Sequence, residues 1–302
     1  LESNKAQIYN VSIAYLCFIM FYPENPSIGT GLEGRYRMKK IIYLVLGAAC
    51  MAASLLSGCA GAKQASGTLT VGVRNDIVDF GYLNEKTGKY YGLEIDIANE
   101  MAERMGYENV EFVTVDPDTR KDMLLEGKVD CLVACYSISE SREENFDFSS
   151  PYYTDEAKMM IEKSTMFQDV EDLKDKTIGI VSGSNAGPQL AISMYEMGII
   201  TDKVLSNTDE ATEYEGLHVK KLATYQELSE ALEEGTVDAV CMDGCITATY
   251  MNEDREIMDI QLAEQNYGVA TQKGSELSGQ VEQAIQEMLD DGTIDTLIDK
   301  WN

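Results

Sequence analysis

Short apolar runs alternate with amphipathic stretches along most of the chain. The clearest helical pattern lies between Leu93 and Met105, where Ile97 and Met101 share one face and Gly106 supplies an end signal. The other predicted elements are strands at 68–73, 110–115 and 129–135, a short helix at 119–126, and two final helices between 276 and 301 that Gly292 separates. This alternation predicts an α/β protein with mainly parallel sheets.

One pattern of helix, glycine, valine, aspartate and buried strand occurs twice. The first copy contains Gly127-Lys128-Val129-Asp130, and the second, 108 residues later, contains Gly235-Thr236-Val237-Asp238. This separation is too long for a solenoid repeat and predicts two similar lobes. A ligand would bind where the lobes face each other, at the carboxyl ends of their strands. The segments to examine are therefore 135–142 after the first buried strand and Asp243 after the second.

Composition narrows the possible functions. The 302 residues include 24 Lys plus Arg against 52 Asp plus Glu, a net charge of −28. A chain this acidic would repel nucleic acid and anionic lipid surfaces, and we expect no nucleic-acid partner and a soluble monomer. The single histidine, His218, nearly excludes a histidine-based triad or a histidine-rich metal site. We therefore expect no metal and no cofactor.

The N-terminal part of the sequence has the composition of an export signal. Met38-Lys39-Lys40 precedes an apolar stretch that ends at Leu56 and is followed by Ser57-Gly58-Cys59. The apolar stretch is short and rich in Gly and Ala, which favours a cleaved signal over a membrane-spanning helix. Leu56 to Cys59 resembles a bacterial lipobox, in which Cys59 would be acylated. The alternative is a plain signal peptide with an incidental cysteine.

These features divide the chain into expected segments. The predicted divisions are a start-site artefact or leader at 1–37, a lipoprotein signal peptide at 38–58, a lipidated tether at 59–67, a first lobe at 68–155 plus 264–302, and a second lobe at 159–258. The mature protein would be anchored by lipid to the outer face of the bacterial cell membrane, in the periplasm or at the cell surface.

Four motifs in a fixed order resemble those of one family. They are Gly92-Leu93-Glu94-Ile95-Asp96-Ile97-Ala98, the block from Gly127 to Tyr153, Ile178-Gly179-Ile180-Val181-Ser182-Gly183-Ser184, and Val237 to Asp243. The region 68–302 resembles the amino-acid-binding receptors of ABC importers, solute-binding protein family 3, which have the type II periplasmic-binding fold. The resemblance implies two α/β lobes joined by a double crossover, with hinges near 154–160 and 257–266. It also implies a ligand in the inter-lobe cleft and a membrane permease as partner.

The resemblance assigns roles to residues by position. Arg142 matches the arginine that holds the α-carboxylate of the ligand, and Ser137 with the backbone amides of Ser137 and Ser184 would complete the cradle. Asp243 matches the carboxylate that binds the ammonium group, helped by the carbonyl of Cys135. The alternatives are that Arg142 is a surface arginine among acidic residues and that Asp243 is a helix N-cap.

Two further arginines bear on the side chain of the ligand. Arg74 and Arg120 lie where similar receptors for acidic amino acids carry basic residues. Beside a ligand with a neutral side chain, the buried positive charges of these two arginines would have no compensating anion. They therefore favour a ligand with an acidic side chain, such as glutamate or aspartate. The alternative is that they pair with local acids: Asp76, Asp116 or Asp118. Tyr225 matches a tyrosine near the ligand side chain, although packing at a helix start explains it equally well.

Two other functions remain open at the level of sequence. Some relatives on this fold are periplasmic dehydratases, and Glu94 and Glu140 are available carboxylates for such an enzyme. A receptor that feeds a sensor instead of a transporter is a third possibility. We expect Cys131, Cys135, Cys241 and Cys245 to be buried free thiols, with a disulfide possible in an exported protein.

Overall fold

The computed structural model describes residues 67–301. The chain divides into two units, 1–63 and 64–302. The predicted leader, the signal peptide, Cys59 and the tether as far as residue 66 lie outside the described residues. Between residues 67 and 301, no helix has both the length and the apolar character needed to cross a membrane.

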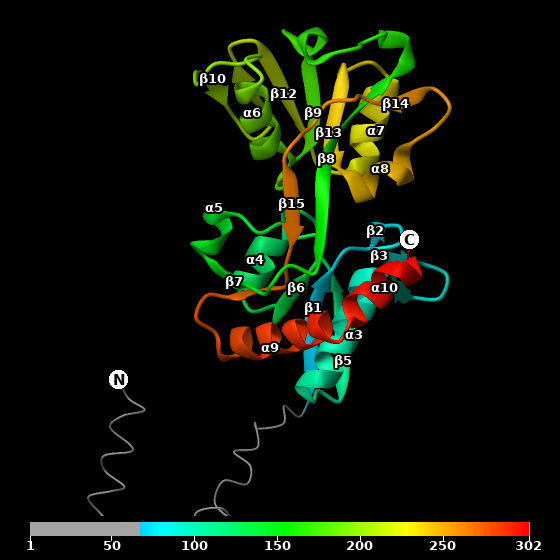
Figure 1. The fold of residues 1–302 in the computed structure, drawn as a ribbon, viewed down its shortest axis with the longest axis vertical. Coiled ribbons are helices and arrows are strands. Elements are labelled where there is room, and N and C mark those ends of the chain that lie inside the picture. The colour runs from blue at the N-terminus through cyan, green and yellow to red at the C-terminus, as the bar shows by residue number, and fades with distance from the viewer. Residues whose placement is uncertain (1–66, 302) are drawn as a thin grey trace, which may run out of the picture. The chain divides into compact units, whose positions relative to one another are not determined.

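The first lobe is built on a five-stranded sheet with the order β5-β1-β6-β16-β7 (Figure 1). Strand β1 pairs in parallel with β5 and β6, whereas β16 pairs antiparallel with β6 and β7. The strands are β1 (Thr68–Val73), β5 (Asn109–Thr114), β6 (Cys131–Val133), β7 (Phe146–Phe148) and β16 (Ala270–Gln272), with a small separate sheet of β2 (Asp76–Ile77), β3 (Gly81–Asn84) and β4 (Lys89–Tyr91). The helices are α3 (Leu93–Met105), α4 (Arg120–Leu125), α5 (Glu140–Glu143), α9 (Glu276–Asp290) and α10 (Thr293–Trp301).

The second lobe is built on the larger sheet, with the order β10-β11-β12-β9-β13-β8-β14. Strand β9 pairs in parallel with β12 and β13 at its centre, and β8 pairs antiparallel with β13. The strands are β8 (Tyr153–Glu162), β9 (Thr177–Val181), β10 (Val204–Asn207), β11 (Ala211–Tyr214), β12 (Leu217–Leu222), β13 (Ala239–Asp243) and β14 (Arg255–Ile257). The helices are α6 (Ala186–Glu196), α7 (Tyr225–Glu233) and α8 (Gly244–Tyr250), with 3₁₀ turns η1 (Lys163–Thr165) and η2 (Val170–Leu173).

Two adjacent strands carry the chain between the lobes. Strand β8 pairs antiparallel with β15 (Glu264–Tyr267), from Tyr153 opposite Tyr267 to Glu156 opposite Glu264. Figure 1 shows these two strands running side by side from one lobe to the other. The farther half of β8 continues into the sheet of the second lobe, where it pairs with β13 and β14. The predicted hinge segment 154–160 therefore lies within one ten-residue strand.

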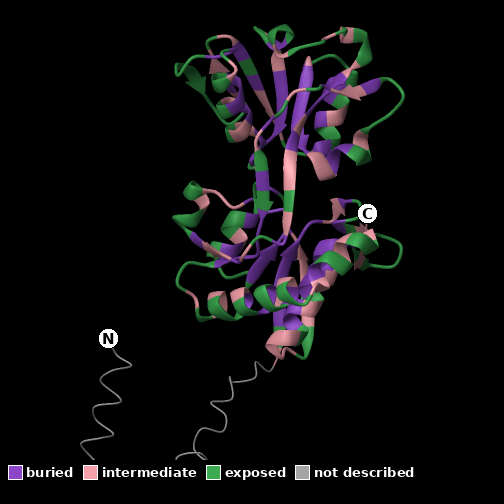
Figure 2. Cartoon of the chain, viewed as in Figure 1, coloured by how far each residue is buried: buried purple, intermediate pink, exposed green. Residues whose placement is uncertain are grey.

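Most predicted elements are confirmed, and one strand is wrong at both ends. The prediction of mainly parallel sheets is wrong: β1 pairs in parallel with β5 and β6, and β9 with β12 and β13, whereas the other strand pairings in the described part of the chain are antiparallel because hairpins and the strands between the lobes supply them. The helix from Leu93 to Met105 has the predicted bounds, and Gly106 ends it in the left-handed region with φ 83°. The strand predicted at 129–135 shrinks to Cys131–Val133. At its start Asp130 turns its carboxylate to the amide of Thr70, and after its end Cys135 adopts a left-handed φ of 45°. Figure 2 shows that buried residues gather on the strands of both sheets, as the predicted α/β fold requires.

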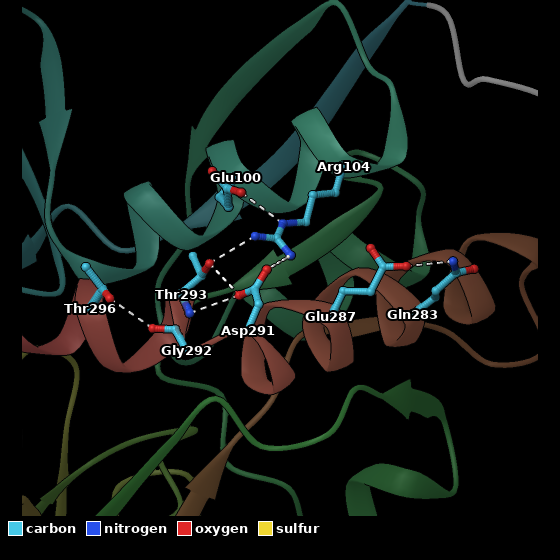
Figure 3. A network of polar contacts seen from close by, with 8 residues as sticks. All are labelled: Glu100, Arg104, Gln283, Glu287, Asp291, Gly292, Thr293 and Thr296. Carbon is cyan, nitrogen blue, oxygen red and sulfur yellow. Dashed lines mark hydrogen bonds and ion pairs between the residues drawn. The ribbon is translucent and has the colours of Figure 1, made fainter.

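A polar network fixes the C-terminal helices to helix α3 (Figure 3). The Arg104 guanidinium donates hydrogen bonds to Glu100 at 2.8 Å, to Asp291 at 2.7 Å and to Thr293 at 2.9 Å. Hydrogen bonds from Thr293 and Arg104 lower the pKa of the Asp291 carboxyl to about 2. These residues lie at the surface of the first lobe, so Arg104 provides a comparison for the arginines between the lobes.

Candidate functional site

Arg142, on the short helix α5, reaches the contact between the two lobes. Its Nη1 donates to the carbonyl of Ser137 at 2.8 Å, and its Nη2 donates to the carbonyl of Gly183, in the second lobe, at 3.3 Å. Burial, together with the nearby Arg120, lowers the pKa of Arg142 to about 10. The guanidinium therefore stays charged at neutral pH while its hydrogen bonds go to neutral carbonyls.

Arg120 opens helix α4 and is 3% exposed. Its Nη1 donates to the carbonyls of Ala134 at 2.7 Å and Cys135 at 3.2 Å, and its Nη2 donates to that of Gly183 at 3.4 Å. Its Nε has no hydrogen-bond partner among the described residues. Burial, and then the charge of Arg74, lower the pKa of Arg120. A buried cation bonded only to neutral carbonyls favours the arrival of an anion.

Tyr136 is a platform for both guanidinium groups, a role that its sequence context did not predict. The central carbon of Arg142 lies 4.3 Å from the centre of the Tyr136 ring, and that of Arg120 lies 4.5 Å from it. Such stacking holds a cation without neutralising its charge. The position of Tyr136 within the predicted site segment 135–142 was the available signal, but its role depends on where two distant arginines lie.

Arg74 has a different environment from the other two arginines. It follows β1 and donates two hydrogen bonds to Asp76, from Nε at 3.0 Å and from Nη2 at 2.7 Å. Burial opposes its charge, but the Asp76 carboxylate raises the pKa of Arg74 above its ordinary value. The premise that Arg74 is uncompensated is therefore wrong. Its guanidinium also lies 5.5 Å from the ring of Tyr225, a buried residue at the start of α7.

Asp243 ends strand β13 with its carboxylate buried. Oδ1 accepts a hydrogen bond from Nε2 of Gln265 at 2.7 Å, and Oδ2 accepts one from the hydroxyl of Tyr267 at 2.7 Å. Burial raises the pKa of Asp243, although these hydrogen bonds oppose the shift. Asp243 stands at the N-cap position of α8, yet its side chain caps nothing; Asp155 instead accepts from the amide of Cys245 at 2.9 Å. The N-cap interpretation of the Asp243 side chain is wrong.

The remaining predicted residues make local contacts around this cluster. The Ser137 hydroxyl donates to Oε1 of Gln265 at 2.7 Å. In the second lobe, the hydroxyl and the amide of Ser184 both donate to the carbonyl of Val181, at 2.6 and 3.2 Å. The carbonyl of Cys135 accepts from Arg120, as described above. The structure thus brings Arg120, Ser137, Arg142 and Asp243 to one place between the lobes, with Gln265 and Tyr267 joining them.

Glu94 lies beneath the cluster on helix α3 and is fully buried. Its Oε1 accepts hydrogen bonds from the amide of Cys135 and the hydroxyl of Tyr152. Its Oε2 has no partner among the described residues. Burial raises the pKa of Glu94, with opposition from its hydrogen bonds and from Arg74. A carboxyl group in such surroundings favours its neutral form.

A cavity of about 280 Å³ opens beside Arg142. Residues of both lobes line it, among them Asp118, Lys121 and Tyr136 from the first lobe and Gly183 from the second. Gly183 has φ 68°, and a Cβ there would lie 2.5 Å from the carbonyl oxygen of Pro117. At this point the two lobes therefore approach each other so closely that only a glycine fits.

The cysteines and acids of the described part form no metal centre. No group of three or more His, Cys, Asp or Glu side chains between residues 67 and 301 is placed to hold a metal ion. The four cysteines in this range are free thiols; Cys131, Cys135 and Cys241 are buried and Cys245 is half-buried.

Comparison with known proteins gives one consistent family. The family description "Bacterial extracellular solute-binding proteins, family 3" matches residues 69–302. The ABC transporter glutamine-binding protein GlnH of Bacillus subtilis (strain 168) is 27% identical over 288 residues, which cover 87% of this chain and 97% of that protein.

Solved structures agree with this match. An ancestral arginine-binding protein bound to arginine has a TM-score of 0.65 and 30% identity, covering 78% of this chain and 97% of its own. The ancestral amino-acid-binding protein AncCDT-1, a precursor of cyclohexadienyl dehydratase, has a TM-score of 0.63 and 26% identity, covering 78% and 94%. The predicted two-lobe fold of the type II periplasmic-binding class is thereby confirmed.

Proposed function

The chain belongs to the bacterial extracellular solute-binding proteins of family 3, and we propose that it delivers one amino acid to the membrane permease of an ABC importer. The observation that carries the proposal is the division of charge between the lobes. Arg120 and Arg142 of the first lobe bond only to carbonyls, while the second lobe contributes the buried carboxylate of Asp243. An α-amino acid carries the complementary carboxylate and ammonium groups.

The mechanism needs binding and closure but no covalent step. The ligand's α-carboxylate would displace the carbonyl of Gly183 from Arg142, because a carboxylate forms stronger hydrogen bonds with a guanidinium than a neutral carbonyl does. Its ammonium would bind Asp243. A ligand held by both lobes favours the closed arrangement, and only that preference drives the closing movement.

We further propose that the ligand's side chain is acidic, as in glutamate or aspartate. Arg74 no longer supports this, since Asp76 neutralises it. Arg120 still does, because it is buried, charged and bonded to carbonyls, with Nε unpartnered in the described part of the chain. A distal carboxylate would accept from Nε and remove the cost of an uncompensated cation. The related proteins named above are called glutamine-binding and arginine-binding, so their names do not decide the side chain.

Thermal-shift screening of the twenty amino acids and cystine tests both parts of the proposal. At about 100 times its Kd, the true ligand should add about 2.7 kcal/mol to the free energy of unfolding. Glutamate or aspartate should raise the Tm most. A larger shift with a neutral or basic amino acid would overturn the acidic preference alone. No shift with any amino acid would overturn the binding function.

An Arg120 variant separates the side-chain proposal from general damage. Arg120→Met removes the charge but keeps much of the buried stem, so it should lose the response to glutamate or aspartate while staying folded. Arg104→Met is the matched control, because Arg104 lies in the surface network of Figure 3. The control should bind like the parent chain.

A dehydratase-like enzyme is the second candidate, and one residue favours it. Glu94 is a fully buried carboxyl group with a raised pKa, the state required of a general acid, and it lies under the amide of Cys135. Mass spectrometry of bound amino acids after prolonged incubation tests it. Recovery of unchanged ligand supports the receptor, and release of a dehydrated product supports the enzyme.

For the location we propose an extracytoplasmic receptor with lipid on Cys59, a residue outside the described part of the chain. The family description supports an extracellular setting, and the sequence from Leu56 to Cys59 supports the anchor. One acyl chain binds membranes only marginally, so two or more chains should be present. Intact-mass analysis of membrane-extracted protein should find a mature N-terminus at acylated Cys59. A mature N-terminus upstream of Met38 would contradict the proposed anchor.

A further inference from the structure

Strand β15 alternates between two faces, and its buried face points at the proposed ligand site. Glu264 and Asn266 are exposed, whereas Gln265 and Tyr267 are almost fully buried. This period of two is what a strand imposes on successive side chains. On the exposed face, the side chain of Asn266 has one hydrogen-bond partner among the described residues: its Oδ1 accepts from the hydroxyl of Thr154 at 2.8 Å. On the buried face, the side chains of Gln265 and Tyr267 form hydrogen bonds with the predicted site residues Ser137 and Asp243.

Gln265 joins one site residue of each lobe. Its Nε2 donates to Oδ1 of Asp243 at 2.7 Å, and its Oε1 accepts from the hydroxyl of Ser137 at 2.7 Å. A carboxylate accepts hydrogen bonds only, so the NH₂ end of the amide must face Asp243. The hydroxyl proton of Ser137 is consequently committed to Oε1. Because the hydroxyl of Ser137 is used in this way, the backbone amide of Ser137 is the group that can donate to a ligand carboxylate.

Tyr267 holds the other oxygen of the same carboxylate. Its hydroxyl lies 2.7 Å from Oδ2 of Asp243 and 3.1 Å from Oδ2 of Asp155. Asp155 is itself fixed by the amide of Cys245 at the start of α8. One donor on each oxygen of Asp243 fixes its plane, and each oxygen retains a lone pair for a further donor such as an ammonium group.

We propose that Gln265 and Tyr267 are positioning residues that orient the Asp243 carboxylate toward the ligand's ammonium group. Because Gln265 also bonds to Ser137, this orientation depends on the position of the first lobe. The inference rests on the proposed amino-acid-binding function and deepens it. A carboxylate that already has its binding orientation needs no reorganisation when the ligand binds, so this free-energy cost is avoided. A movement that separates Ser137 from Asp243 must break one of the two bonds of Gln265, so the ammonium site forms together with the lobe contact.

The test uses the near-isosteric variants Gln265→Met and Tyr267→Phe, with Asn266→Leu as the matched control on the exposed face of the same strand. Affinity is measured by calorimetry between pH 4 and pH 8. The probe is the amino acid, among the twenty and cystine, that raises the parent's Tm most. The titratable or charged groups facing Asp243 are Asp155 on β8, Arg120 on α4, Arg142 on α5, Tyr225 on α7, Tyr267 on β15, Cys241 on β13 and Cys245 on α8.

Each positioning variant should weaken binding about tenfold to a hundredfold at pH 7, the effect of one hydrogen bond to a charged group. Each should also move the acidic fall in affinity to higher pH by about one unit, because a lost donor makes the ionised carboxylate less favourable. Asn266→Leu should change neither quantity.

Three results would overturn the inference, and they point to different faults. Unchanged affinity in Gln265→Met and Tyr267→Phe shows that neither residue positions Asp243. A loss that is equal at every pH shows a purely structural role. A parent chain that binds no amino acid overturns the proposed function and this inference with it.

Discussion

Strand β6 of the first lobe and strand β13 of the second follow the same Gly-x-Val-Asp motif, and the two motifs make the same contacts. Gly127 and Gly235 have φ 69° and 68°. Asp130 accepts a hydrogen bond from the amide of Thr70 at 2.8 Å, and Asp238 accepts one from the amide of Thr177 at 2.8 Å. In each lobe the aspartate thus binds the backbone of the neighbouring parallel strand, within β1 in the first lobe and at the first residue of β9 in the second.

The lobes diverge where these strands end. After β6 the backbone turns left-handed at Cys135, and its carbonyl accepts from Arg120. At the end of β13 the chain instead presents the buried carboxylate of Asp243. The first lobe therefore supplies cations to the space between the lobes, and the second supplies an anion. The same motif and strand in both lobes can therefore bind a ligand with two opposite charges, because the residues that follow the strands differ.

The largest expected effect comes from removing either charge of the clamp. Arg142→Ala and Asp243→Ala should each weaken amino-acid binding by about 2–5 kcal/mol, or roughly 30- to 5,000-fold, because each leaves a ligand charge buried without its partner. Calorimetry measures the loss, with circular dichroism to check folding and Arg104→Ala as control. Parent-like binding by either variant would remove that residue from the clamp.

The contact between the lobes can be blocked without changing a charge. Gly183→Ala would place a Cβ 2.5 Å from the carbonyl oxygen of Pro117, so the lobes could not approach as they do here. Affinity should fall about tenfold or more, because the competent closed state becomes less populated. Gly235→Ala is the matched control, with φ 68° and nothing within 4 Å of the added Cβ.

The control should lose only about 1–2 kcal/mol of stability from left-handed strain and should bind normally. Calorimetry and urea unfolding separate the two effects. Equal affinity in the two glycine variants would mean that closure does not use the Gly183 contact.

The shared framework predicts a smaller and graded effect on stability. Asp238→Ala should cost about 1–3 kcal/mol, because the half-buried amide of Thr177 loses its acceptor. Asp130→Ala should cost about 0.5–1.5 kcal/mol, because its hydrogen bond with the amide of Thr70 is exposed and water can replace the lost acceptor. Urea unfolding provides both values. A greater loss in Asp130→Ala would contradict the argument that exposure to water sets the size of the two losses.

The smallest effect concerns pH and a carboxyl group found only in the first lobe. The folded-state pKa of Glu94 is raised above its ordinary value of 4.5 by burial. Its contribution to stability is therefore full below that value and is lost as the pH rises through the folded-state pKa. Relative to the parent, Glu94→Gln should become progressively more stable as the pH rises above 4.5. Urea unfolding at several pH values measures this slope, and a constant difference would mean that Glu94 does not titrate in the range measured.

The sequence by itself determined the main elements of the first lobe, the final helices and their order. The helix from Leu93 to Met105, the final helices around Gly292 and the duplicated motif follow from periodicity and turn residues, which are properties of neighbours along the chain. The ordered motifs then sufficed to predict the family and the two-lobe fold. They also directed attention to the segment 135–142 and to Asp243, because strand ends of an α/β fold are where ligands bind.

Only the tertiary structure decided which charges are compensated. From the sequence, Arg74 could bind the ligand side chain or form an ion pair with Asp76, and in the structure it forms the ion pair. The sequence also allowed Asp243 to cap helix α8. In the structure Asp155, which lies 90 residues before Cys245, accepts the hydrogen bond from the Cys245 amide instead.

The only sequence signal for Tyr136 was its position in the predicted segment 135–142, and the link through Gln265 had no sequence signal. Gln265 meets Ser137 across 128 residues. Hydrogen bonds and stacking act over a few ångströms in space, and no local pattern states which distant side chains the fold will bring within that range.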